Sequence, residues 1–105
     1  MPMITISLCM IVKNEEEVLD RCLSSIADLM DEIIIVDTGS TDRTKEIARR
    51  YTSKIYDFAW TGNFADARNY SFSKASAQYI YCADADEVLD AENHAKFRLL
   101  KKGLL

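Results

Sequence analysis

Apolar runs rich in isoleucine and valine alternate along the chain with segments whose apolar residues recur every three or four positions. The first pattern predicts buried strands and the second predicts amphipathic helices. Strands are expected over residues 4–12, 32–37, 54–57 and 78–83. A helix capped by Asn14 should follow the first strand, and further helices are expected over residues 42–51, from an Asn63 cap to about residue 75, and from an Asp90 cap to near Lys101.

This alternation of strands and helices predicts an α/β fold. Strands separated by helices pair in parallel, and right-handed crossovers place the helices on both faces of the sheet. We therefore expect a Rossmann-like three-layer sandwich around a mostly parallel, four-stranded sheet. Ligands of such sheets bind at the carboxyl ends of the strands, so the residues that follow each strand are the candidates for a functional site.

Length and composition narrow the class of protein. A chain of 105 residues and 12.0 kDa corresponds to one domain. With 49% hydrophobic and 29% charged residues it has the balance of a globular protein. The net charge of −4 argues against a general nucleic-acid-binding protein. Because the longest apolar runs are too short to cross a bilayer, we expect no direct membrane insertion.

The three cysteines, Cys9, Cys22 and Cys82, occur at no zinc-binding or redox spacing. Each lies in an apolar run. We therefore expect buried, reduced thiols and a cytoplasmic location.

Carboxylates gather after the predicted strands. Glu15 follows the first strand, Asp37 ends the second, and Asp84 and Asp86 follow the fourth. If the backbone stays extended, Asp84 and Asp86 point to the same side. Two close carboxylates suit a hard cation, Mg²⁺ or Mn²⁺, which completes its coordination with water and phosphate oxygens. The alternative is that both residues only cap the next turn, and their spacing does not decide between the two interpretations.

Other candidate residues also have a structural interpretation beside a functional one. Asp37 could bind the amides of its own turn, or accept a hydrogen bond from a base or a ribose. Arg68 fits the solvent face of a helix, and as a functional residue it would direct a cation at a phosphate or a base. The aromatic residues Phe58, Trp60 and Phe64 are expected to form a packed cluster rather than a sugar platform.

Four segments together resemble the nucleotide-binding half of family 2 glycosyltransferases. They are ISLCMIVKNE (residues 6–15), IIIVDTGSTD (33–42), FADARN (64–69) and YIYCADADE (79–87). The order and the approximate spacing are those of the family. The resemblance implies a GT-A fold with the strand order 3-2-1-4. It also implies a nucleotide-diphosphate sugar donor, most often a uridine (UDP) sugar, and a Mg²⁺ or Mn²⁺ cofactor.

The resemblance also implies a role for each matching residue. Asp37 would accept a hydrogen bond from the base, and Lys13 and Glu15 would line the base and ribose. Arg68 would reach the nucleotide. Asp84 would contact the ribose or share the metal, and Asp86 would hold the metal against the phosphates.

Enzymes of this family invert the anomeric centre with a carboxylate general base that lies in their second half. No residue of this sequence matches that base motif. We therefore expect residues 1–105 to form a single nucleotide-sugar-binding domain of a longer transferase, without turnover of its own. Such a sheet would have an exposed edge, through which two copies could form a homodimer.

Two other interpretations stay open. A nucleotidyltransferase-like domain is disfavoured because Lys13-Asn14-Glu15 replaces the glycine- and lysine- or arginine-rich signature expected after its first strand. A non-catalytic, Mg²⁺-binding scaffolding or receiver-like module would share the acidic cluster but not the preference for a nucleotide.

Overall fold

The computed structural model describes residues 4–102 and contains the four predicted strands and four predicted helices. The strands are β1 (Ile6–Val12), β2 (Glu32–Asp37), β3 (Ile55–Asp57) and β4 (Tyr79–Cys82). The helices are α1 (Leu19–Ile26), α2 (Thr44–Ala48), α3 (Phe64–Lys74) and α4 (Ala91–Lys101), with a short 3₁₀ helix, η1 (Ala27–Leu29), after α1.

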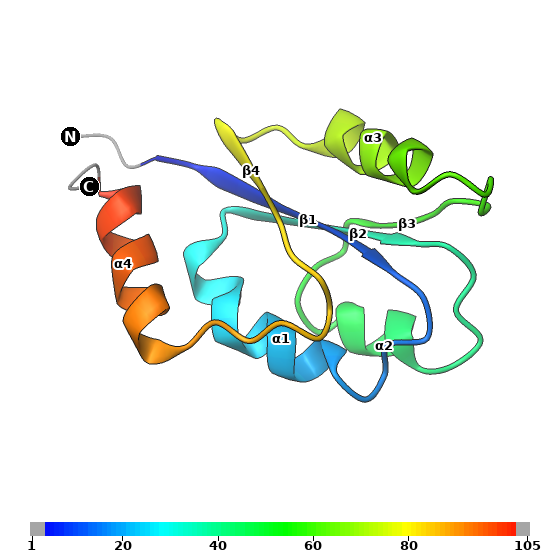
Figure 1. Cartoon of the computed structure of the whole chain (residues 1–105), viewed down its shortest axis with the longest axis horizontal. Coiled ribbons are helices and arrows are strands. Elements are labelled where there is room, and N and C mark those ends of the chain that lie inside the picture. The colour runs from blue at the N-terminus through cyan, green and yellow to red at the C-terminus, as the bar shows by residue number, and fades with distance from the viewer. Residues whose placement is uncertain (1–3, 103–105) are drawn as a thin grey trace.

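All strand pairs are parallel, and the sheet order is β3-β2-β1-β4. This confirms the predicted fold class and strand order. Helices α1 and α2 cover one face of the sheet, and α3 covers the other (Figure 1). The register of the central pair places Val12 of β1 opposite Asp37 of β2. The loops that follow these two strands therefore start side by side.

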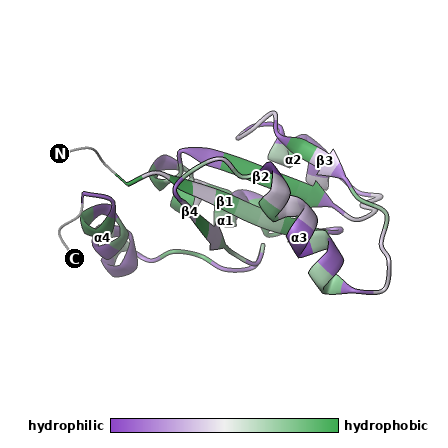
Figure 2. Cartoon of the chain, turned by 90° about the horizontal axis from the view of Figure 1, so that it is seen from above, coloured by the Kyte–Doolittle hydropathy of each residue, from purple (hydrophilic) through white to green (hydrophobic). Residues whose placement is uncertain are grey.

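The core is built around β1 and β2, which are buried along almost their whole length. On the α1 side, Leu8 and Met10 belong to the same buried cluster as Leu19 and Leu23. On the α3 side, a smaller cluster forms around Cys9, Ile34 and Val36. Figure 2 shows the hydrophobic colouring of these strands. Each fully buried aliphatic side chain contributes about 1.5–3 kcal/mol, and most of the large, fully buried side chains lie on these two strands.

Two of the three predicted helix caps are confirmed. The Asn63 side chain accepts a hydrogen bond from the Ala65 amide at 2.9 Å, and the Asp90 side chain accepts one from the Asn93 amide at 2.8 Å. The prediction for Asn14 is wrong: α1 begins five residues later, at Leu19, and no side chain caps it. Asn14 instead adopts a positive φ of 52° in the loop after β1.

The helix predicted over residues 42–51 is confirmed only over Thr44–Ala48. Its start is displaced because Asp42 turns its carboxylate toward the chain that follows. Asp42 Oδ1 accepts a hydrogen bond from the Thr44 amide at 2.9 Å. A side chain that binds a backbone amide two residues later favours a turn over a helix.

Helix α4 is held at the amino ends of the strands by a buried lysine. Lys101 Nζ donates hydrogen bonds to the Leu29 carbonyl at 2.9 Å and to Asp31 Oδ2 at 2.8 Å. Asp31 Oδ2 also accepts a hydrogen bond from the Ile6 amide at 2.8 Å. This one side chain therefore joins α4 to η1 and, through Asp31, to the start of β1.

The sheet edge formed by β4 is exposed. Tyr79 is 58% exposed and Ile80 is 43% exposed. Cys82 is also exposed, so the prediction of three buried thiols holds only for Cys9 and Cys22. Cys82 differs because it lies on an edge strand that has a neighbour on one side only. Within residues 4–102, no helix has the length and apolar character needed to cross a membrane.

A buried carboxylate joins the amino ends of three strands. Glu32 is only 8% exposed. It accepts hydrogen bonds from Ser7 Oγ at 2.7 Å, from the Ser76 amide at 2.8 Å, and from Lys54 Nζ. Burial opposes ionisation of Glu32, but these hydrogen bonds outweigh it and lower its pKa to about 2. Ionised Glu32 is therefore stabilised in the folded state.

We predict that Glu32→Gln lowers the free energy of unfolding by about 2 kcal/mol near neutral pH, because charged hydrogen bonds are lost. The folded pKa of about 2 lies below the ordinary value of 4.5. The stabilisation is thus complete above the ordinary pKa and disappears as the pH falls toward the folded one. Urea unfolding near pH 7 and near pH 3, followed by circular dichroism, should show the difference from wild type shrinking in acid.

The matched control is Glu46→Gln, since Glu46 pairs with Arg43 on the exposed surface. We expect no measurable change in stability for this variant. Equal stability of wild type and Glu32→Gln at neutral pH would contradict the role assigned to Glu32.

Candidate functional site

The loops that follow β1 and β2 are joined by hydrogen bonds. The Asn14 amide donates to Ser40 Oγ at 2.9 Å, and Asn14 Oδ1 accepts from the Thr41 amide at 2.8 Å. The Glu15 amide donates to Thr44 Oγ1 at 2.8 Å. These bonds satisfy backbone groups that neither strand nor helix pairs. They also hold the loop that carries Glu15 against the loop that follows Asp37.

Asn14 suits this loop for a conformational reason. Its φ of 52° lies in the left-handed region, which asparagine tolerates better than most residues. The sequence analysis missed this role because Asn14 also matches a helix-capping pattern. The signal that could have revealed it is the polar run Ser40-Thr41-Asp42, which offers partners to a neighbouring loop.

Asp37 has two carboxylate oxygens in different environments. The residue is 1% exposed. Oδ1 accepts hydrogen bonds from the amides of Gly39 at 2.8 Å and Ser40 at 2.7 Å. Oδ2 is buried and has no hydrogen-bond partner among residues 4–102. The predicted turn-binding role is thus realised by one oxygen, and the second is free to accept a hydrogen bond.

Asp84 and Asp86 lie in the segment after β4, where exposed and buried residues alternate. Both are exposed, whereas Ala83 and Ala85 beside them are buried. The backbone does not stay extended, because the Glu87 amide donates to the Asp84 carbonyl at 3.0 Å and closes a turn. This turn is closed by a backbone carbonyl and by neither carboxylate. The two aspartates therefore keep their side chains available.

The negative charges of Asp84 and Asp86 affect the pKa of Glu15. Burial raises the pKa of Glu15 above its ordinary value, and the charges of Asp86, Asp42 and Asp84 raise it further. The fold therefore brings carboxylates from the loops after β1, β2 and β4 within electrostatic range of one another. Such a concentration of negative charge favours a cation.

The negative charges near Asp84 and Asp86 also affect the pKa of a residue in helix α1. Burial raises the pKa of Cys22 to about 11, and the charges of Glu87 and Asp86 contribute to this rise. The Cys22 thiol lies 3.6 Å from the Asp84 carbonyl oxygen. The turn after β4 therefore contacts helix α1.

The two basic candidates are both exposed. Lys13 is exposed in the loop after β1. Arg68 is exposed on α3, and its guanidinium carbon lies 4.9 Å from the centre of the Phe64 ring. The helix-face interpretation of Arg68 is compatible with this exposure, although the aromatic contact was not expected.

The predicted aromatic cluster forms only in part. Phe58 packs on Tyr70 with ring centres 4.9 Å apart. Trp60 is 51% exposed and Phe64 is 45% exposed, so the prediction is wrong for these two residues. For Trp60 the reason is tertiary: the segment between β3 and α3 extends beyond the end of the sheet, and no element of the described residues covers it there (Figure 1).

The carboxylates at the carboxyl ends of the strands suit a metal ion that takes few ligands from the protein. Within residues 4–102, no group of three or more histidine, cysteine, aspartate or glutamate side chains is arranged to hold a metal ion by itself. Magnesium typically takes one or two carboxylates and completes its shell with water and substrate phosphates. Asp84 and Asp86 offer that number of oxygen ligands.

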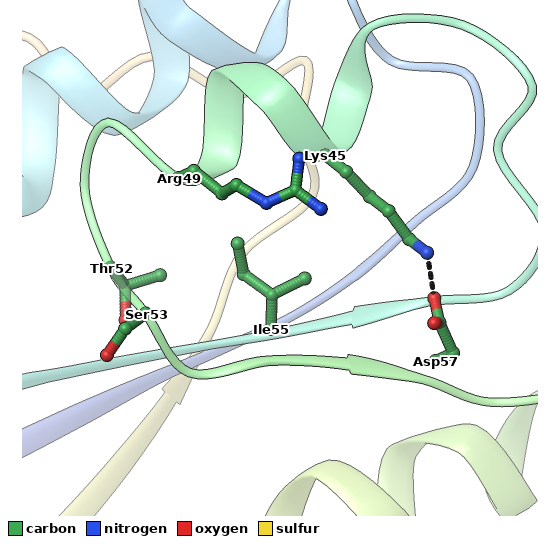
Figure 3. Close-up of a pocket in the computed structure, with 6 residues that line it drawn as sticks. All are labelled: Lys45, Arg49, Thr52, Ser53, Ile55 and Asp57. Atoms are coloured by element: carbon green, nitrogen blue, oxygen red, sulfur yellow. Dashed lines mark ion pairs between the residues drawn. The ribbon is translucent and has the colours of Figure 1, made fainter.

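A separate hollow of about 410 Å³ lies between α2 and β3, away from these residues. Its lining is shown in Figure 3, where Lys45 forms an ion pair with Asp57. None of the predicted site residues lines it.

Solved structures with the same fold define the class of protein. The chain superposes on Staphylococcus aureus TarS (residues 1–349) with a TM-score of 0.77 over 95% of this chain and 33% of that one, at 22% identity. The glucosyl-3-phosphoglycerate synthase of Mycobacterium tuberculosis matches with a TM-score of 0.69 and 25% identity, over 80% of this chain. That enzyme has been crystallised with Mg²⁺ and UDP, and with Mn²⁺ and UDP-glucose. The architecture is therefore that of GT-A, Rossmann-like glycosyltransferases.

Sequence comparison identifies the family. The model of glycosyl transferase family 2 matches residues 7–97, and this chain belongs to that family. A TPR repeat-containing protein of Synechococcus elongatus is 44% identical over 91% of this chain. The glycosyltransferase SunS of Bacillus subtilis is 36% identical over 88% of it. The chain spans only 24% and 22% of these two relatives.

We predict that Asp86→Asn lowers the pKa of Glu15, because one of the charges that opposes its ionisation is removed. Titration of the side-chain carboxyl resonances by NMR measures this directly. Asp28→Asn is the control, since Asp28 lies in η1 and pairs with His94. An equal change in both variants would show that Asp86 does not face Glu15.

Proposed function

We propose that this chain is the donor-binding portion of an inverting glycosyltransferase that uses a nucleotide-diphosphate sugar, with UDP as the nucleotide. The observation that carries the proposal is the free Oδ2 of Asp37. A buried carboxylate oxygen without a partner costs about 1–3 kcal/mol. A ligand that donates a hydrogen bond to this oxygen would remove that penalty.

The imide N–H of uracil is a donor of the required kind. In this proposal it binds Asp37 Oδ2, while Oδ1 stays with the turn amides that fix the carboxylate. The ring nitrogen N3 of cytosine carries no hydrogen and cannot replace that donor. Asp37 would thus contribute to the choice of base as well as to affinity.

We assign each remaining candidate to a part of the nucleotide sugar by its position along the carboxyl ends of the strands. Lys13 and Glu15 lie on the loop after the central strand β1 and would line the base and ribose. Asp84 would contact the ribose or share the metal. Arg68 would reach the nucleotide.

Asp86, with Asp84, would hold the divalent cation, Mg²⁺ or Mn²⁺. When bound, this cation would offset the negative charge that develops on the departing diphosphate. The support is electrostatic: the carboxylates after β1 and β4 lie within range of one another, and Asp84 and Asp86 are both exposed.

The longer relatives and the crystallised enzymes exceed this chain at least twofold in length, since the chain covers no more than about a third of each. We place the general base and the acceptor site in the additional part of a longer transferase. These 105 residues would then bind nucleotide and metal without transferring sugar. We also propose a cytoplasmic location, supported by three free cysteines.

A Mg²⁺-binding scaffolding module is the second candidate. It would bind the cation at Asp84 and Asp86 but would not select a uridine nucleotide. The orphaned oxygen of Asp37 favours the transferase interpretation, because it lies on β2, which β1 separates from the strand that leads to Asp84 and Asp86. An acceptor there suits a ligand that extends along the carboxyl ends of the strands.

We predict that wild-type chain binds UDP in calorimetry, and that Mn²⁺ strengthens this binding. Asp86→Asn should remove the effect of Mn²⁺. Asp37→Asn should weaken binding about tenfold even without metal, because a charged hydrogen bond to the base is lost. UDP-glucose in the same solution should remain unconsumed.

The control variant is Asp57→Asn, which removes a carboxylate at the end of β3 that already pairs with Lys45. It should bind UDP as wild type does. Metal binding without any nucleotide binding would support the scaffolding module. Transfer of sugar by these residues alone would contradict our placement of the general base.

We further propose that two copies of this chain associate through the edge of β4. The edge presents no charged residue, and an apolar hollow of about 300 Å³ lies beside it. It is lined by Ile4, Ile6, Tyr79, Ile80, Tyr81, Phe97 and Leu100. Unprotected apolar edges of this kind pair readily.

We predict a dimer at high protein concentration by light scattering, and a monomer for Ile80→Lys, because a charge on the edge opposes pairing. Ser53→Lys adds the same charge at an exposed turn and should leave the dimer intact. A wild-type monomer at every concentration would refute the association.

A further inference from the structure

Arg68 is held by an aromatic ring instead of a carboxylate. Phe64 precedes it by four residues on α3, a spacing that places two side chains on the same face of a helix. The guanidinium carbon lies 4.9 Å from the centre of the Phe64 ring, within the range of a cation–π contact. Within the described residues 4–102, the guanidinium makes no ion pair.

This kind of contact leaves the hydrogen-bonding capacity of the arginine intact. A guanidinium has five N–H donors in its plane. A carboxylate partner would occupy two of them, whereas a ring packed against the planar group leaves the donors free. The ring also restricts a long, flexible side chain, so that less entropy is lost when a ligand binds.

The position of Arg68 indicates which part of a nucleotide it would meet. Arg68 precedes Ser71 by three residues on α3, and the Ser71 carbonyl accepts a hydrogen bond from the Cys9 thiol of β1 at 3.7 Å. Cys9 pairs in register with Cys82 at the end of β4. In agreement with this geometry, the positive charge of Arg68 opposes the rise that burial causes in the pKa of Cys82. The guanidinium is therefore close to the end of the strand that leads to Asp84 and Asp86. The free oxygen of Asp37 belongs to β2, on the other side of β1. Helix α3 packs against β1 and β2. Arg68 therefore lies near β1 and the end of β4, between the strand that carries Asp37 and the turn that carries Asp84 and Asp86.

We propose that Phe64 is a positioning residue that holds Arg68 toward the diphosphate of the donor. This inference rests on the proposed function. A diphosphate that binds one divalent cation keeps a net negative charge, and planar guanidinium donors match phosphate oxygens well. Phe64 itself touches no phosphate: its ring orients the group that does.

The experiment compares two ligands, UDP and uridine, in calorimetry with Mg²⁺ present. Phe64→Leu removes the ring but keeps an apolar side chain at a half-exposed position. We expect it to weaken UDP binding about fivefold, the size of a cation–π contact, and to leave uridine binding unchanged. Phe64→Tyr keeps an aromatic face and should bind UDP as wild type does.

Arg68→Gln should weaken UDP binding by about tenfold or more, again without an effect on uridine. Adding Phe64→Leu to Arg68→Gln should cause no further loss, because the ring then has nothing to position. A purely structural role for Phe64 would instead weaken both ligands and would add to the effect of Arg68→Gln. Thermal unfolding of each variant checks that the fold is intact.

The outcomes separate the two proposals. If wild-type chain binds UDP and Phe64→Leu binds it equally well, the role of Phe64 is overturned while the proposed function stands. If Phe64→Leu weakens uridine as much as UDP, the assignment to the diphosphate is wrong. If wild-type chain does not bind UDP, both the proposed function and this inference fail.

Discussion

The parallel pairing of β1 with β2 is the constraint on which the rest of the structure depends. Both strands are buried on both faces, so a shift of one residue in register would move buried side chains out of their clusters. That register places Val12 beside Asp37. The two loops that leave the sheet there are consequently adjacent, and hydrogen bonds between Asn14, Ser40 and Thr41 close the contact.

Buried charged groups have partners at the amino ends of the strands but are incompletely satisfied at the carboxyl ends. At the amino ends, Glu32 and Lys101 are buried with partners that satisfy them. At the carboxyl ends, Asp37 keeps one buried oxygen without a partner among residues 4–102, and burial together with neighbouring charges disfavours the ionisation of Glu15. Unsatisfied groups and concentrated like charges destabilise a fold. Within residues 4–102, the unpartnered oxygen and these neighbouring carboxylates lie at the end where parallel sheets bind ligands, which agrees with a site for a polar ligand together with a cation.

The sequence predicted the strands better than the starts of the helices. A buried parallel strand needs a run of apolar residues, and Glu32–Asp37 shows that signal without competition. Helix starts depend on which partner a polar side chain selects. Asn14 carries the chemistry of a cap, but its side chain accepts a hydrogen bond from the Thr41 amide, which the tertiary fold brings close. Asp42 divides its carboxylate between the local Thr44 amide and the Glu16 amide of the neighbouring loop. Similarly, the aromatic character of Trp60 predicted burial, and only the position of its loop beyond the sheet leaves it exposed.

By itself, the sequence determined the fold class, the strand order through a family resemblance, and the residues that follow each strand. These properties are local, or are carried by motifs of fixed spacing. Only the tertiary structure decided the environment of each candidate. It left one oxygen of Asp37 without a partner among the described residues, and it brought Glu15 into the field of Asp86. Burial, hydrogen-bond satisfaction and electrostatic fields depend on segments far apart in the chain, and no pattern along the sequence contains them.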